Sequence, residues 1–91
     1  MATLVFEIWR EPDGSHTMEQ VRPENDELRS RIAPDAIRVH SFRASTDFEA
    51  FRVNNKWQGF AAWVPEPDWK ERQFTDEEQR DQDTYLRERS V

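Results

Sequence analysis

The chain contains no cysteine and only two glycines among its 91 residues. The lack of cysteine excludes disulfides, Cys-based zinc sites and thiol catalysis. Two glycines are too few for a GxGxxG or Walker loop, in which glycines bring the backbone close to phosphate. None of the serines lies in a GxSxG motif. We therefore expect neither a nucleotide-dependent enzyme of a familiar kind nor a serine hydrolase of that type.

Long hydrophobic runs and an excess of positive charge are also missing. The apolar stretch at residues 3–10 is broken by Glu7, and nothing approaches the ~20 apolar residues that a membrane-spanning helix needs. The first residues have no basic n-region. The formal net charge is −6, whereas nucleic acids and anionic membranes are bound through clustered Lys and Arg. We expect a cytoplasmic protein that binds neither membrane nor nucleic acid directly.

Histidine is scarce as well, with His16 and His40 alone in the chain. Neither belongs to an HxxxH or HExxH motif, the spacing that zinc sites on helices require. The abundant acids lack the glycine and the twelfth-position glutamate of a calcium loop. We therefore expect no metal, no cofactor and no catalytic residue.

The first half of the chain is typical of two strands, a helix and a third strand. Polar and apolar residues alternate over 3–10, and the Pro-Asp-Gly turn that follows favours a β-hairpin closing by residue 20. Trp9 and Met18 are expected to meet across it. The segment 23–33 begins with proline and places acids early and arginines late, as a helix prefers. A third strand is expected over 36–44, laid parallel to the first by a right-handed crossover.

A second helix is predicted over residues 47–57. Thr46 and Glu49 match a capping box at its start, and Gly59 can end it. At about 100° per residue, its apolar residues form two flanks that both need cover, from a sheet on one side and from a returning segment or second subunit on the other. The flanks are Phe48 and Phe51, opposite Ala50, Val53 and Trp57.

The remaining chain is short of apolar residues after position 64. Residues 59–64 are compatible with a last strand, and 65–69 should be extended because of their prolines. A polar helix over 76–89 follows a second capping box, and only Tyr85 and Leu86 offer it firm anchors.

Together these elements predict an α+β fold with the order β-β-α-β-α-(β)-α. The sheet should be small and mainly antiparallel, with three or four strands and with helices largely on one face. Residues 1–74 are expected to form the compact core domain. Residues 75–91 should form a polar C-terminal helix that packs on this domain or extends from it.

Residues 57–69 hold three of the four tryptophans. Most rings in so small a domain are structural, because aromatic side chains dominate the energetics of small cores. Alternation over 59–64 and the extension imposed by proline would still leave Trp63 and Trp69 partly exposed. The candidate site residues are an aromatic surface, consisting of Trp57, Phe60, Trp63 and Trp69, and the third-strand residues Arg38, His40 and Arg43.

Three functions are compatible with these features. We favour a noncatalytic interaction module that binds a protein partner, or a second copy of itself, through the aromatic surface. The first alternative is a small-molecule pocket, catalytic or not, lined by the same aromatics with Arg38, His40 or Arg43 as polar contacts. The second is an acidic inhibitor or nucleic-acid mimic that binds a basic protein site through residues 66–91, where most of the excess negative charge lies.

Overall fold

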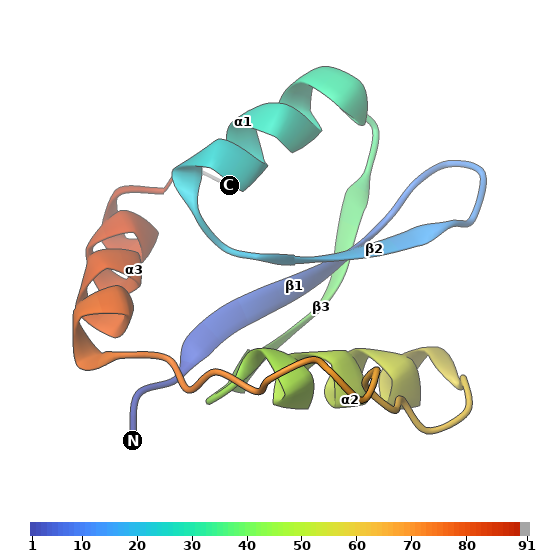
Figure 1. The fold of residues 1–91 in the computed structure, drawn as a ribbon. Helices are drawn as coiled ribbons and strands as arrows, with labels where there is room; N and C mark the ends of the chain where they lie inside the picture. Colours follow the sequence, from blue (N-terminus) through green and yellow to red (C-terminus); the bar gives the residue numbers. More distant parts are fainter. Residues whose placement is uncertain (90–91) are drawn as a thin grey trace.

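The computed structural model describes residues 1–89 (Figure 1). It contains a three-stranded antiparallel sheet and three helices in the order β-β-α-β-α-α, which confirms the α+β class. Residues 59–64, whose sequence is compatible with a fourth strand, are irregular in the structure. The elements are β1 (Leu4–Arg10), β2 (His16–Gln20), α1 (Pro23–Ile32), β3 (Ile37–Ala44), α2 (Asp47–Gln58) and α3 (Asp76–Glu88).

β1 is the central strand of the sheet, and both of its neighbours run antiparallel to it in the order β2-β1-β3. The expectation that β3 is parallel to β1 is therefore wrong. A crossover helix makes the strand after it parallel to the strand before it, and the strand before α1 is β2. Because β2 already runs antiparallel to β1, the crossover gives β3 that same direction.

The hairpin turn determines which side chains of β1 and β2 are neighbours. It contains Gly14, whose φ of 91° is rare for residues with a side chain. The resulting register pairs Trp9 with Thr17 and Ile8 with Met18. Since successive side chains point to opposite faces, Trp9 and Met18 lie on different faces, and the expected contact between them is wrong.

The two faces of β1 carry different chemistry. Towards α2 the face is apolar, and the Phe6 ring lies 5.7 Å from that of Phe42 and 5.9 Å from that of Phe74. Towards α1 and α3, Glu7 and Trp9 meet arginine side chains. Two of the three helices thus share one face, and Figure 1 shows α1 and α2 on opposite sides of the sheet. The apolar core cluster consists of Leu4, Phe6, Ala44, Ala50 and Phe74, with Met18 and Phe42 packed against it.

α2 has cover on both of its apolar flanks, as the sequence predicts. Thr46 caps its start by accepting a backbone N–H of the first turn, and Gly59 ends it with a φ of 79°. On one flank, Ala50 joins the core cluster under the sheet. On the other, the ring of Trp63 lies 5.1 Å from that of Phe48. The sheet supplies the first cover and the returning segment supplies the second.

This returning segment, residues 60–74, runs back along α2 (Figure 1) and is tied near both ends. The N–H of Phe60 donates to the carbonyl of Asn55 at 2.9 Å, and the N–H of Phe74 donates to that of Ser45 at 3.0 Å. Between these anchors the chain forms neither helix nor strand. The conformation of its middle therefore depends on side-chain contacts.

Gln82 anchors α3 to the sheet. Its side-chain oxygen accepts the N–H of Val5 at 2.7 Å, and its amide nitrogen donates to the carbonyls of Val5 and Val21, both at 3.0 Å. Beyond the end of β2, the Gln82 side chain thus makes the hydrogen bonds to β1 that a neighbouring strand would otherwise make. The expectation that only Tyr85 and Leu86 anchor α3 is wrong, because both are half-buried and the buried residue of the helix is polar.

Replacing Gln82 with leucine should destabilise the protein by about 2–4 kcal/mol, because the Val5 N–H and the Val21 carbonyl lose their partner in a buried position. Urea unfolding of the variant and the wild type measures this difference. Asp81→Ala, which changes the exposed neighbour on α3, should cost less than about 0.5 kcal/mol. Equal losses in the two variants would contradict the anchoring role.

Glu78 should contribute to the stability of the protein against acid. Hydrogen bonds from Arg72, together with the N–H of Thr75, lower the pKa of Glu78 to about 2 from an ordinary value of 4.5. A group with a lowered folded-state pKa stabilises the fold above pH 4.5 and loses that contribution as the pH falls towards 2. In urea titrations at stepped pH, Glu78→Gln should lose stability less steeply over this window, whereas Glu77→Gln should follow the wild type. A wild-type slope for Glu78→Gln would refute the assignment.

Candidate functional site

Trp57 lies near the end of α2, on the flank that faces the sheet. Its ring stacks on that of His40 in β3, with centroids 5.1 Å apart and an interplanar angle of 11°. His16 of β2 contacts it edge-on at 5.7 Å. The indole is still 40% exposed. The two histidines, one on each outer strand, therefore hold a partly exposed ring across the face of the sheet.

Trp63 and Trp69 lie on the outer flank of α2. The Trp63 ring contacts those of Phe48 and Phe51, with a centroid distance of 5.1 Å in each case, and stacks on Trp69 at 6.3 Å. Trp63 is half-buried, whereas Trp69 is 54% exposed. The two indoles therefore differ: Trp63 fills the space between helix and returning segment, and Trp69 extends the stack into solvent.

An open cavity of about 510 Å³ lies beside Trp63. Phe60, which is 61% exposed, forms part of its apolar wall. Arg52 and Lys56 lie one turn apart on the same face of α2 and bring two positive charges to it. The cavity is lined by Arg52, Lys56, Gly59, Phe60, Ala62 and Trp63.

The structure does not bring the three polar candidates of β3 together. His40 faces α2 and contacts its tryptophan. A β-bulge leaves Val39 unpaired and so sends Arg38 to the other face, where it donates to Glu7 at 3.0 Å. Arg43 is also on that face and lies 3.9 Å from an acid of α3. A single pocket holding the aromatics and all three side chains is therefore not formed.

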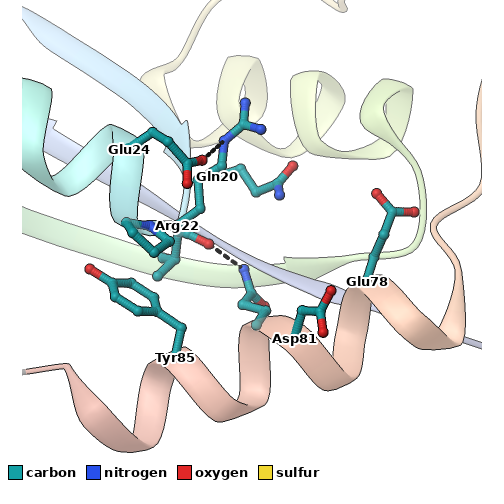
Figure 2. Close-up of a pocket in the computed structure, with 9 residues that line it drawn as sticks. Gln20, Arg22, Glu24, Glu78, Asp81 and Tyr85 are labelled. Carbon is teal, nitrogen blue, oxygen red and sulfur yellow. Dashed lines mark hydrogen bonds and ion pairs between the residues drawn. The ribbon is translucent and has the colours of Figure 1, made fainter.

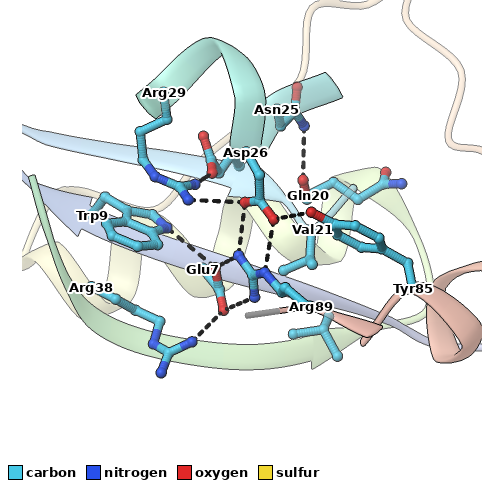
Figure 3. A network of polar contacts seen from close by, with 12 residues as sticks. Glu7, Trp9, Gln20, Val21, Asn25, Asp26, Arg29, Arg38, Tyr85 and Arg89 are labelled. Carbon is cyan, nitrogen blue, oxygen red and sulfur yellow. Dashed lines mark hydrogen bonds and ion pairs between the residues drawn. The ribbon is translucent and has the colours of Figure 1, made fainter. Parts of the chain in front are cut away.

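On the face opposite α2, a charged network is buried between the sheet, α1 and the end of α3 (Figure 3). Its central members are Glu7, Asp26, Arg29 and Arg89. The side chain of Arg89, only 6% exposed, donates two hydrogen bonds of 2.7 Å to Glu7 and two of 2.8 Å to Asp26. Arg29 donates to Asp26 at 2.9 Å, and its guanidinium lies 3.5 Å from the centre of the Trp9 ring. These contacts join the first strand to the end of the last helix.

Burial and charge pairing oppose each other in this network. Burial would raise the pKa of Glu7, but hydrogen bonds from Arg89 and Arg38 outweigh it and hold that pKa below its ordinary value. Burial, together with a hydrogen bond to Asp26, raises the pKa of Tyr85. At neutral pH the glutamate is therefore ionised and the tyrosine neutral. The network is therefore suited to holding the fold together.

Three acids of this region, Glu7, Glu19 and Asp26, bring carboxylate oxygens within 4.8 Å of one another. Such a group resembles the oxygen ligands of a divalent cation. In this structure, however, Arg29 donates to Glu19 and Asp26, and Arg89 donates to Glu7. The guanidinium groups already satisfy the acids, so we assign no metal site to them. Sequence reasoning missed the network because its members come from segments far apart in the chain, although a lone acid within an apolar strand signals a buried pair.

A second cavity, of about 260 Å³, lies between the end of β2, the start of α1 and α3 (Figure 2). Most charged groups at its rim are already paired, since Arg22 lies 3.8 Å from Glu24 and Glu78 is bonded to Arg72, while Asp81 is exposed to solvent. Throughout residues 1–89, no buried side-chain nitrogen or oxygen lacks a hydrogen-bond partner. The buried polar side chains of these residues therefore offer no unpaired group to a ligand. The aromatic surface is the stronger candidate site.

Arg89→Ala should leave Glu7 and Asp26 without their buried cation and cost about 3–5 kcal/mol in the free energy of unfolding. Methylguanidinium should restore part of this loss, because its planar donors can pair with two carboxylates at once. Methylammonium is a point charge and should restore less. Urea unfolding of the variant with each compound at equal ionic strength tests this expectation.

Arg87→Ala is the matched control, because it removes an exposed arginine from the last turn of α3. It should change the free energy of unfolding by less than about 0.5 kcal/mol, with no difference between the two compounds. If Arg89→Ala responds equally to both, the two-carboxylate geometry is not what stabilises this end of the chain.

Comparison of the chain with known protein families, curated proteins and solved structures finds no match. Within residues 1–89, none of the helices has both the length and the apolar character that spanning a bilayer requires. The function must therefore be inferred from the aromatic surface and from the charges around it.

Proposed function

We propose that the protein is a noncatalytic interaction module that binds a protein partner through the aromatic surface. One observation carries this proposal: Phe60 is mostly exposed in the wall of an open cavity, and Trp69 is mostly exposed where it stacks on Trp63. Aromatic residues are enriched in the buried centres of protein interfaces. Binding a partner would remove these large apolar surfaces from water, which is favourable.

The rings are also held in place before binding. Trp69 stacks on Trp63, and Trp63 packs against Phe48 and Phe51 of α2. Trp57 is fixed by its stacking on His40. Because association costs side-chain conformational entropy, rings that are already ordered lose less when a partner binds. This is the behaviour of aromatic anchors at interface hot spots.

The geometry supports a protein partner better than the alternatives. Of the polar contacts from β3 that a small-molecule pocket would draw on, only His40 reaches the aromatic surface, since Arg38 and Arg43 lie on the opposite face. An acidic mimic would bind through the carboxylates of α3, and two of them already pair within the chain, Glu78 with Arg72 and Asp83 with Arg43. A second copy of this chain is one protein that the surface would accept.

Peptides selected from a random phage-displayed library on the wild-type protein provide the test. The replacements Phe60→Ser and Trp69→Ser should weaken the binding of these peptides at least about tenfold, as expected for hot-spot rings. Fluorescence anisotropy with labelled peptides measures the affinities. If the partner is a second copy, light scattering should show a mass that rises with concentration, and Phe60→Ser should abolish the rise.

Ile32→Ser is the control, because Ile32 is an apolar residue of α1 with 71% exposure, away from the aromatic surface. It should leave peptide affinity and apparent mass unchanged. The proposal fails if the selection yields no binders and the wild type stays monomeric. It also fails if Phe60→Ser and Trp69→Ser bind the selected peptides as the wild type does.

A further inference from the structure

We infer that the cavity beside Trp63 accepts an acidic segment of the partner, with an apolar side chain inside the cavity and neighbouring Asp or Glu residues paired with Arg52 and Lys56. This inference rests on the proposed function and adds the chemistry of the partner to it. It is argued from the cavity beside Trp63 and from the two cations that line it.

The cavity suits one large apolar side chain. Its volume of about 510 Å³ lies within the roughly 300–1,000 Å³ typical of binding pockets. Phe60, Ala62 and Trp63 provide apolar lining. The Trp63 ring is braced by α2, so this wall is firm. An aromatic or branched aliphatic side chain would find contacts there without requiring the segment to rearrange.

The charge at the cavity is opposite to that of the whole chain. Arg52 and Lys56 both line it, whereas the chain carries a formal charge of −6. Lys56 takes part in none of the ion pairs that the described residues form. Arg52 lies 3.7 Å from Glu71 in a solvent-exposed pair. Such pairs are weak, so a carboxylate of the partner can replace Glu71.

A nucleic acid would need a longer positive track than this. Single-stranded nucleic acid combines stacking on aromatic rings with a basic groove that follows the backbone. Here the chain after the cavity carries Glu66, Asp68 and Glu71, with Lys70 just before Glu71 and Arg72 just after it. This alternation would repel a continuous line of phosphates, whereas one or two carboxylates beside an apolar side chain fit the two cations.

Two small probes that share a phenyl ring test the inference: 3-phenylpropionate, an anion, and 3-phenylpropylamine, a cation. Each is titrated into the full chain while the indole N–H signal of Trp63 is followed by NMR. Affinities in the millimolar range are expected for ligands of about ten non-hydrogen atoms. The anion should bind about fivefold more tightly at low salt, and the difference should shrink at ~1 M salt, where the Debye length is about 3 Å.

Charge reversal at one position separates the cavity from the general field of the protein. Lys56→Glu should reverse the preference, so that the amine binds more tightly, and Lys56→Gln should reduce it. Lys70→Glu makes the same change of charge on an exposed lysine that does not line the cavity. It should leave the preference for the anion in place.

Three results would overturn the inference: equal affinities for the two probes, a preference that Lys56→Glu does not change, or no movement of the Trp63 signal with either probe. None of them overturns the proposed function, which is decided by peptide binding to Phe60→Ser and Trp69→Ser. Conversely, if the selected peptides bind Phe60→Ser and Trp69→Ser as tightly as the wild type, the proposed function is refuted, regardless of the results with the two probes.

Discussion

The structure depends on the burial of Glu7 at the centre of β1. This strand is paired along both edges and covered on both faces, so its acid has no access to bulk water and must find cations within the protein. Arg38 supplies one from the neighbouring strand. Arg89 supplies the other from 82 residues away in sequence. The need to pair one buried charge therefore brings the end of α3 back to the first strand.

A second constraint, the cover that α2 needs, determines the path of the chain between α2 and α3. The sheet covers only one flank of α2, and the other carries Phe48 and Phe51, which need cover of their own. The chain after Gly59 supplies it by running back along the helix to Phe74, which enters the core. Because hydrogen bonds tie this segment mainly at its ends, stacked rings hold its middle. An exposed aromatic surface is the consequence.

Local patterns in the sequence predict most of the elements and their ends. The residues Pro23, Gly59 and Thr75 each mark a helix boundary in the structure, since the backbone preferences behind these signals act over a few residues. Long-range features have no such local signature. The bonds from Gln82 to β1 and the pairing of Arg89 join opposite ends of the chain, and no periodicity in the sequence announces them.

The candidate site is predictable in position but not in shape. Trp63 and Trp69 are both partly exposed, as the sequence predicts, but residues 59–64 form no strand, so strand alternation is not the reason for the position of Trp63. A shift of one residue moves a side chain to the other face, which is how the bulge takes Arg38 away from the aromatics. The charged network and the aromatic surface thus lie on opposite faces of the sheet. The fold does not require the exposed surfaces of Phe60 and Trp69 to remain in water. A partner that covers them would gain the free energy of removing this apolar surface from water.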